Sequence, residues 1–147
     1  MKLILLFAGC QIGAVVFGIA MFSRLNDELQ PAVDASESFL TEAARNHVHA
    51  AYLQASDAFQ KQVSEESLSQ YLRKNNLMDI ASFSWNFRSI KHEKGQTKGT
   101  LHTRDGQEMP VKVLLIYQNE SWKVNRLFLG TQELADFKPT QPTRSQP

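Results

Sequence analysis

The chain has 147 residues, of which 42% are hydrophobic, and its 16 basic and 15 acidic side chains give a net charge of +1. This length allows one modest domain once an apolar N-terminal stretch is set aside. The near-neutral charge argues against a dedicated nucleic-acid-binding protein, because such proteins carry a strongly basic surface. A single cysteine, Cys10, excludes an intramolecular disulfide and a multi-cysteine metal site.

The N-terminal segment Leu3–Phe22 contains no charged side chain. At a rise of ~1.5 Å per residue, a helix of this length spans the ~30 Å hydrocarbon core of a bilayer. Lys2 precedes the segment, and Arg24, Asp27 and Glu28 follow it. The positive-inside preference then leaves the N-terminus in the cytoplasm and places the remaining chain outside. We therefore predict a transmembrane anchor, or uncleaved signal, over residues 1–23.

Two other fates of this segment stay open. Small residues at Gly18 and Ala20 allow signal cleavage near Ala20, which would release a secreted domain. The stretch "FAGC" resembles a lipoprotein box ending at Cys10, but nine residues are short for such a signal, and the apolar run continues to Phe22. If the anchor is retained, Gly9 and Gly13 form a GxxxG pair that would let two membrane helices approach closely.

Residues 24–33 are predicted to form a juxtamembrane linker, with Pro31 interrupting any continuous helix. Asp34 is followed three residues later by Glu37, a capping-box pattern that predicts the start of a helix. Apolar residues then recur with a helical period as far as Ala55.

Ser64 has the chemistry of an N-cap, and Asn75 and Asn76 are suitable terminators, so a further helix is predicted between them. Acidic residues dominate this first half of the domain. Basic residues dominate the stretch that follows, from Arg88 to Arg104. Such asymmetry predicts two faces of opposite charge, which can orient self-association or a partner.

The hydrophobic period changes to two after Asp79, because Phe83, Trp85 and Phe87 alternate with polar residues, as in a half-buried strand. The pair Asp105-Gly106 predicts a hairpin between two further strands. The second of these strands is apolar on both faces, so we expect it to be central and covered on both sides.

A fourth strand is predicted in "WKVNRLFLG". Helices followed by an antiparallel meander make an α+β domain, which we assign to residues 34–137. Residues 138–147 contain three prolines and no apolar side chain, so they are predicted to form a disordered tail.

The stretches "AAYLQASDAFQKQVSEESLSQYL" and "GTLHTRDGQEMPVKVLLIYQNESWKVNRLFL" resemble the nuclear transport factor 2-like (cystatin-like) superfamily, in particular its small membrane-tethered or secreted bacterial domains. The residues that carry this resemblance are Tyr52, Phe59, Leu68, Gly106, Trp122 and Val124. The resemblance implies two or three helices on a curved sheet of about four strands. Together these form a cone whose pocket is lined by aromatic side chains. It indicates a fold and not a function, because this fold hosts unrelated tasks.

The residues that we expect to line such a pocket are Tyr52, Phe59, Asp79, Trp85 and Tyr117. Asp57 and Asp79 lie among apolar residues, but a solvent-facing helix position for Asp57 and a turn cap for Asp79 explain them better than catalysis does, so no catalytic residue is assigned. His47 and His49 would point about 200° apart on a helix, so no metal site is predicted. No cofactor motif is present, and we expect no cofactor.

We therefore expect a non-catalytic domain for protein contact or envelope assembly, anchored in the bacterial cytoplasmic membrane on its periplasmic or extracellular side. Homodimerisation is compatible with this expectation. The alternative is a pocket for an apolar or aromatic small molecule, with or without weak acid–base catalysis. The two differ in what they require, since a ligand site needs apolar walls with converging polar groups, and an assembly domain needs an exposed contact surface.

Overall fold

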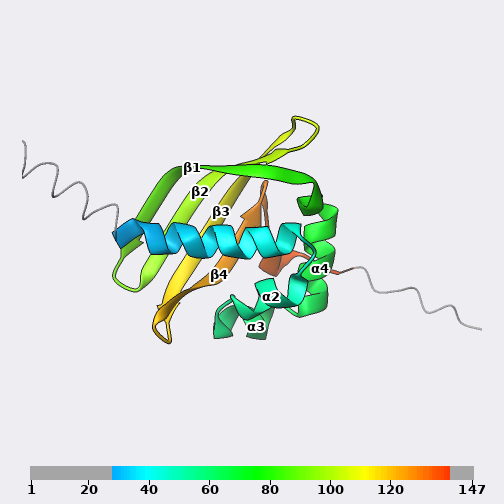
Figure 1. Cartoon of the computed structure of the whole chain (residues 1–147). Helices are drawn as coiled ribbons and strands as arrows, with labels where there is room; N and C mark the ends of the chain where they lie inside the picture. Colours follow the sequence, from blue (N-terminus) through cyan, green and yellow to red (C-terminus); the bar gives the residue numbers. More distant parts are fainter. Residues whose placement is uncertain (1–27, 140–147) are drawn as a thin grey trace, which may run out of the picture.

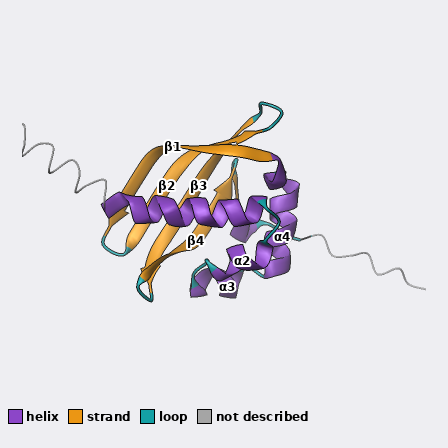
Figure 2. Ribbon diagram, viewed as in Figure 1, coloured by secondary structure: helices purple, strands orange, loops and turns teal. Residues whose placement is uncertain are grey.

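The computed structural model describes residues 28–139, which form an α+β domain with its helices packed against one antiparallel sheet (Figures 1 and 2). Residues 28–44 form the longest helix, called the long helix below. Three shorter helices follow: α2 (Val48–Leu53), α3 (Asp57–Gln62) and α4 (Glu65–Lys74). The predicted anchor Leu3–Phe22, Cys10 and residues 140–147 lie outside the described residues. Within residues 28–139, no helix has both the length and the apolar character needed to cross a membrane.

The sheet is a meander, because its strands lie side by side in chain order and every neighbouring pair is antiparallel. Its strands are β1 (Ile80–Lys91), β2 (Lys94–Thr103), β3 (Glu108–Gln118), β4 (Ser121–Leu129) and β5 (Gln132–Glu133). Short 3₁₀ turns, η1 (Leu77–Asp79) and η2 (Leu134–Asp136), precede β1 and follow β5. The α+β class and the four main strands predicted from the sequence are confirmed, and the two-residue β5 is an addition.

The core lies between the long helix and the sheet face that the helix crosses (Figure 1). Helix residues at a spacing of three or four face the sheet and are fully or almost fully buried: Ala32, Ser36, Phe39, Leu40 and Ala43. Alternate strand residues meet them from the other side: Leu101, Val111, Val113, Leu115, Val124, Leu127 and Leu129. Each fully buried leucine or valine contributes roughly 1.5–3 kcal/mol of transfer free energy, so this layer is the main source of stability.

The long helix begins earlier than the capping box at Asp34 predicts, because residues 28–33 are already helical. Ala32 and Val33 are buried, so at least this part of the predicted linker (24–33) belongs to the domain. Proline at position 31 lacks an N–H, and the helical acceptor of that N–H would be the carbonyl of residue 27, outside residues 28–44. No hydrogen bond within residues 28–44 is therefore lost.

The helical period that continues to Ala55 in the sequence is interrupted in the structure at Asn46. This residue has a positive φ of 62°, and the α2 helix starts only after it. Asparagine is one of the few residues that adopts this left-handed conformation readily. A second break precedes α3. Ser56 caps the N-terminus of α3, because its hydroxyl accepts a hydrogen bond from the Phe59 N–H. The sequence analysis did not predict α3.

Two local predictions are confirmed in detail. Ser64 caps α4 by accepting a hydrogen bond from the Ser67 N–H, and the helix ends at Asn75, before Asn76 with a φ of 53°. Gly106 adopts a φ of 89° in the turn between β2 and β3. Both features depend on residues close together in the chain, which explains why the sequence pattern identifies them.

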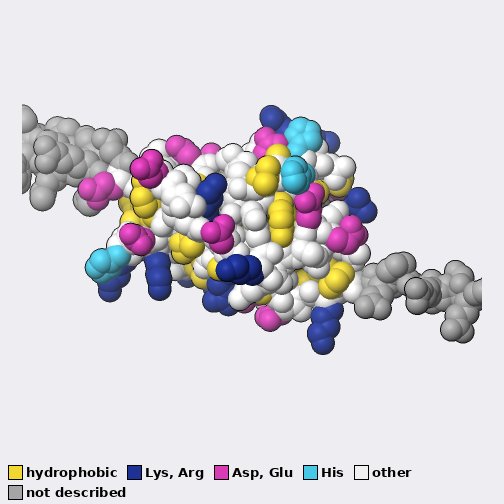
Figure 3. Space-filling model, turned by 90° about the horizontal axis from the view of Figure 1, so that it is seen from below, with side chains coloured by type: hydrophobic (Ala, Val, Ile, Leu, Met, Phe, Trp, Pro, Cys, Tyr) yellow, Lys and Arg dark blue, Asp and Glu magenta, His cyan; other side chains and the backbone are white. Residues whose placement is uncertain are grey.

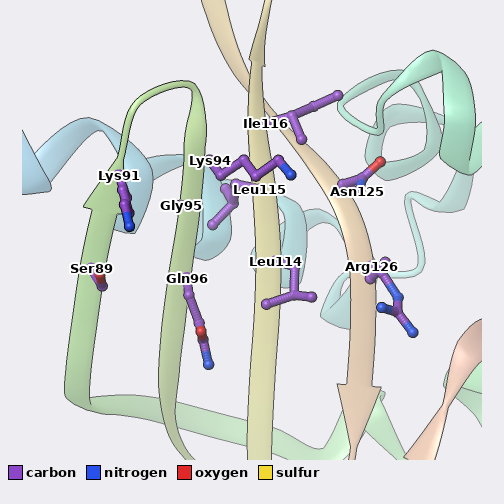
Figure 4. Close-up of a pocket in the computed structure, with 10 residues that line it drawn as sticks. All are labelled: Ser89, Lys91, Lys94, Gly95, Gln96, Leu114, Leu115, Ile116, Asn125 and Arg126. Atoms are coloured by element: carbon purple, nitrogen blue, oxygen red, sulfur yellow. The ribbon is translucent and has the colours of Figure 1, made fainter.

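The predicted covering of β3 on both faces is wrong. β3 lies in the middle of the sheet, and Val113 and Leu115 are buried beneath the helices, but Leu114 and Ile116 on the other face are only half-buried. No element within residues 28–139 covers that second face, which lies toward the viewer in Figure 4 with the helices behind the sheet. The apolar character of Leu114 and Ile116 therefore marks an open surface.

Candidate functional site: the open sheet face

Two of the residues expected to line a pocket, Tyr52 and Phe59, pack together in the core. Their rings meet edge to face with centroids 6.3 Å apart, and Phe59 is only 2% exposed. The Tyr52 hydroxyl donates to the carbonyls of Gln60 and Val63, at 3.0 and 2.9 Å. The void beside Phe59 measures about 10 Å³, which is about the space that one water molecule needs.

The other three expected residues lie on separate elements. The Trp85 indole N–H donates to the Glu37 carboxylate at 2.8 Å, which fastens β1 to the long helix. Tyr117, at the end of β3, is 44% exposed, and its ring packs against that of Trp122 with the ring centroids 5.4 Å apart. Asp79 is exposed in η1. The structure thus brings Tyr52 and Phe59 together and sets Trp85, Tyr117 and Asp79 apart from them.

The two histidines of the H-x-H pattern have different partners. His47 Nδ1 lies 2.8 Å from a Glu42 carboxylate oxygen, and His49 Nδ1 lies 3.0 Å from one of Glu65. Both are exposed ion pairs at helix surfaces, which contribute little to stability. In the part of the chain that the structure describes, no three His, Cys, Asp or Glu side chains are grouped to hold a metal ion.

The sheet face opposite the helices carries most of the features of the domain that could bind a partner or a ligand. Its side chains form rows that run across β1, β2, β3 and β4, because residues paired across antiparallel strands point to the same side. We call this surface the open sheet face. Its three rows are Phe87, Lys98, Lys112 and Phe128; Ser89, Gln96, Leu114 and Arg126; and Lys91, Lys94, Ile116 and Lys123. Figure 3 shows this side of the sheet edge-on along its lower margin, where dark blue side chains protrude.

Like charges stand directly opposite each other on this face. Lys91 pairs with Lys94, and Lys98 pairs with Lys112. None of these lysines forms an ion pair with any residue in the range 28–139. Directly opposed like charges destabilise a sheet, by an amount on the order of 0.2–1 kcal/mol per pair. A domain that keeps two such pairs on one face is less stable than it could be, and an anionic partner would relieve the repulsion.

Aromatic rings hold two of these ammonium groups in place. The Lys98 ammonium lies 5.2 Å from the centroid of the Phe87 ring, and that of Lys112 lies 4.0 Å from Phe128. Such contacts contribute roughly 0.5–1 kcal/mol each at exposed sites. Phe87 nevertheless remains 46% exposed. The row therefore presents two ordered cations between two partly exposed rings.

A shallow groove of about 360 Å³ runs along the other two rows (Figure 4). Its floor includes Leu114 and Ile116, and its rim includes Lys91, Lys94 and Arg126. Arg126 forms a bidentate ion pair with Glu133, which raises the pKa of the guanidinium further above its usual value. The five lysines of the face have no such carboxylate, so its uncompensated charge lies on them.

A Ser–His–Glu cluster lies beyond the groove, on the same side of β1, β2 and β3. Ser84 Oγ is 2.9 Å from His102 Nε2, and His102 Nδ1 is 3.5 Å from a Glu108 oxygen. The order Ser84, His102 and Glu108 matches that of a nucleophile, a general base and an acid that orients the base. The second distance is long for a hydrogen bond, however, and Ser84 and Glu108 are exposed, so water is not excluded from the cluster. We assign it no catalytic role.

Sequence reasoning missed the open sheet face as a site. The sequence shows Lys94 and Lys98 only as part of the basic stretch from Arg88 to Arg104, and it predicts a strand covered on both sides for Leu114 and Ile116. The available signal was the alternation of lysine with small buried residues in β2, together with Lys112 in β3. Bringing these residues into one surface requires the register between strands, which the sequence alone does not supply.

Comparison with protein-family models and with curated proteins finds no match for this chain. Among solved structures, the chain is similar to a Campylobacter jejuni protein described as an NTF2-like transpeptidase. The TM-score is 0.52 with 13% identity, over 63% of this chain and 94% of that one. A DUF4783 family protein from Bacteroides ovatus aligns with a TM-score of 0.48 and 18% identity, over 65% of this chain and 93% of that one.

At this level of identity, similarity with the Campylobacter protein concerns the fold alone. The shared architecture is the one described above, helices on one side of a curved antiparallel meander (Figure 2). The resemblance found in the sequence is thereby confirmed, and this chain has a nuclear transport factor 2-like fold.

Proposed function

We propose that this protein is a non-catalytic contact domain, held by its N-terminal apolar segment at the outer side of the bacterial cytoplasmic membrane. In this proposal the open sheet face docks an acidic segment of an envelope partner protein. The observation that carries the proposal is the pair of opposed lysine pairs, Lys91–Lys94 and Lys98–Lys112, on a face that nothing covers within residues 28–139.

The charge of the face selects the partner's chemistry. Six cations of the three rows face solvent, and among the residues that the structure describes only Arg126 has a carboxylate partner. Carboxylates of a partner would form charge-assisted hydrogen bonds with the lysines and would remove their mutual repulsion. The exposed ring of Phe87 and the half-buried ring of Phe128 supply apolar contact area beside the charges.

The shape of the domain also favours docking over catalysis. The helix side of the sheet is filled by the core, and the groove on the other side is shallow and open. A site for chemistry generally encloses its substrate and excludes water. An open pleated face with ordered aromatic and cationic side chains is better suited to a partner's surface.

Photo-crosslinking in cells tests the proposal. A photoreactive amino acid at Gln96, in the centre of the open sheet face, should give an adduct, and the same group at Gln62 on α3 should not. The adduct should be lost in Lys98→Glu and kept in Lys61→Glu, a matched reversal on α3. Mass spectrometry should map the crosslink to an acidic segment.

A Gln96 adduct that survives Lys98→Glu, or that maps to a neutral segment, would contradict the proposal. An adduct of twice the chain mass would indicate a second copy.

The Lys98→Glu variant also separates docking from folding. It places Glu opposite Lys112, which stabilises the sheet by about 0.2–1 kcal/mol, but it also removes the contact of Lys98 with the Phe87 ring, which costs a similar amount, so the isolated protein should be about as stable as wild type. A variant that folds as well as wild type and docks worse would show that Lys98 acts in binding. Chemical denaturation of the full chain measures the first effect.

A second candidate is a small amphipathic anion bound in the groove. The volume of about 360 Å³ falls in the range of ligand sites, and the apolar floor lies beside cations. A thermal-shift series with decanoate, decanol and decyl-trimethylammonium distinguishes this function from protein docking. Stabilisation by decanoate alone, abolished in Lys94→Glu, would support it.

A further inference from the structure

The open sheet face combines two features whose arrangement specifies more than negative charge in the partner. Leu114 and Ile116 point outward from alternate positions of β3, in the interior of the sheet. They are only half-buried, although both neighbouring strands are in place. Alternate residues of a strand lie about 6.6 Å apart, so these two side chains form a short apolar stripe along β3.

Cations surround this stripe. Lys94 is the direct cross-strand neighbour of Ile116 on one side, and Lys123 is its neighbour on the other. Arg126 is paired with Leu114 on the β4 side. Lys112 lies two residues before Leu114 on the same face of β3. Figure 4 shows Lys91 on β1 and Arg126 on β4 on either side of Leu114 and Ile116, with the side chain of Lys94 extending across β3 between the two apolar residues.

This arrangement follows the general anatomy of a binding hot spot, in which a small apolar centre is surrounded by polar groups. A segment that carried carboxylates alone would leave the apolar stripe in contact with water. A segment that carried apolar residues alone would bury the lysines without partners, which is costly. The complementary ligand therefore has both features in a fixed order.

We propose that the open sheet face recognises an extended peptide segment with apolar side chains at two alternate positions and acidic residues on both sides of them. The apolar pair lies on Leu114 and Ile116. The acidic residues at one end contact Lys91, Lys94 and Lys123, and those at the other end contact Lys98 and Lys112. This inference rests on the proposed docking function and names the class of segment that is docked.

Binding of short synthetic peptides to the full chain in detergent micelles tests the inference. The parent probe has nine residues, with leucine at the fourth and sixth positions, two glutamates at each end and serine elsewhere. One control replaces both leucines by serine, and the other replaces the glutamates by glutamine. Fluorescence anisotropy at low salt should show binding of the parent, at least about ten-fold weaker binding of the serine control, and no binding of the glutamine control.

Protein variants locate the apolar contact. Leu114→Ser should weaken binding of the parent peptide to the level of the serine control, and should leave binding of that control unchanged. Leu53→Ser is the matched variant, because Leu53 is 56% exposed on α2, away from the sheet. It should change neither affinity. Circular dichroism of each variant verifies that it is folded.

The outcomes separate this inference from the function on which it rests. If the serine control binds as tightly as the parent, the apolar stripe is irrelevant and the inference is wrong, although acidic docking stands. If no peptide binds while the Gln96 crosslink maps to an acidic segment, the inference is again wrong and the docking function stands. If the glutamine control binds as well as the parent, charge is not recognised and both proposals are wrong.

Discussion

Tyr71 connects three parts of the fold through one buried hydroxyl group. It accepts a hydrogen bond from the Leu129 N–H at 2.8 Å and donates to the Gln132 carbonyl at 2.6 Å. Its ring packs edge-on against Phe137. Burial raises the pKa of Tyr71 to about 12, because the phenolate would be poorly solvated there. The hydroxyl thus joins α4 to the C-terminal ends of the sheet.

The raised pKa predicts a loss of stability at high pH. The unfolded chain releases the phenol proton near the ordinary value of 10, and the folded chain only near 12. The protonated Tyr71 side chain therefore makes its full contribution to the free energy of unfolding below pH 10, and this contribution is lost as the pH rises to 12. Tyr71→Phe should cost about 1–3 kcal/mol at pH 8, since it leaves the Leu129 N–H without a partner. Between pH 10 and 12 the variant should lose less stability than wild type in urea denaturation. Parallel curves would contradict the assignment.

Ser36 and Thr97 form a buried polar pair between the long helix and β2. Both are fully buried, and their hydroxyl oxygens are 3.0 Å apart. Ser36→Ala should cost about 1–3 kcal/mol, because it leaves the buried Thr97 hydroxyl without this partner. Thr97→Val should cost less, because the Ser36 hydroxyl still donates to the Ala32 carbonyl at 3.0 Å. The double variant should be more stable than the sum of the two single losses predicts. A double-mutant cycle by chemical denaturation measures this coupling, and strict additivity would show that the two hydroxyls do not interact.

At the scale of elements, Asn46 decides where the long helix stops and α2 begins. Its φ of 62° is unfavourable for residues with a β-carbon, by about 1–2 kcal/mol. Asn46→Ala should therefore destabilise the protein by about 1 kcal/mol, and Asn46→Gly should be neutral or slightly stabilising. The comparison of the two variants by thermal or urea unfolding isolates the backbone effect. Equal stability of the alanine and glycine variants would be inconsistent with a left-handed residue at this break.

Gly99 fixes the close approach of β1 to β2. A β-carbon at this position would lie 2.1 Å from the Ser84 carbonyl oxygen, a backbone atom that cannot move aside without shifting the strand. Gly99→Ala should destabilise the domain by about 1–3 kcal/mol or more. Thr100→Ala, next to it on the half-exposed side, should change stability by about 0.5 kcal/mol or less. A well-tolerated Gly99→Ala would mean that β1 is free to move outward.

The elements that the sequence predicted correctly depend on short-range chemistry. The Ser64 cap and the Asp105-Gly106 turn involve residues only a few positions apart. The predicted alternation in β1 holds for Phe83 and Trp85, but a register shift after Trp85 turns Phe87 to the open sheet face, so that part of the prediction is wrong. The break at Asn46 was missed because the apolar period of the long helix is in phase with that of α2. The open side of β3 was missed because Leu114 and Ile116 are as apolar as core residues. Only the position of the helices, which depends on long-range packing, decides which face is covered.

The candidate site could not be predicted for the same reason, because it also depends on long-range packing. Aromatic residues such as Trp85 and Phe59 were chosen for a pocket because aromatic side chains often line ligand sites. In the structure Phe59 packs in the core, and Trp85 fastens β1 to the long helix. The lysine rows become a site only when four strands are in register, and charge counts along the chain do not contain that register.

At the scale of the whole molecule, the proposals describe a domain with one packed side and one binding side. The helices and the inner face of the sheet supply the stability. The open sheet face is not part of this core. It carries lysine pairs that lower the stability of the domain, and a partner would neutralise their charge. In our proposal the apolar segment Leu3–Phe22 tethers the domain to the membrane, and this tether would keep the binding face close to the membrane surface and to other envelope proteins.

The intact mass of the protein recovered from separated cell fractions tests this tethered arrangement most directly. We predict a full-length chain of 16.7 kDa in the membrane fraction, resistant to carbonate washing and open to protease from the periplasmic side. A soluble chain that begins at Met21 would contradict the tether and make the N-terminal segment a cleaved signal. A membrane-bound chain that begins at an acylated Cys10 would contradict it as well, because a lipid and not a transmembrane helix would then hold the domain.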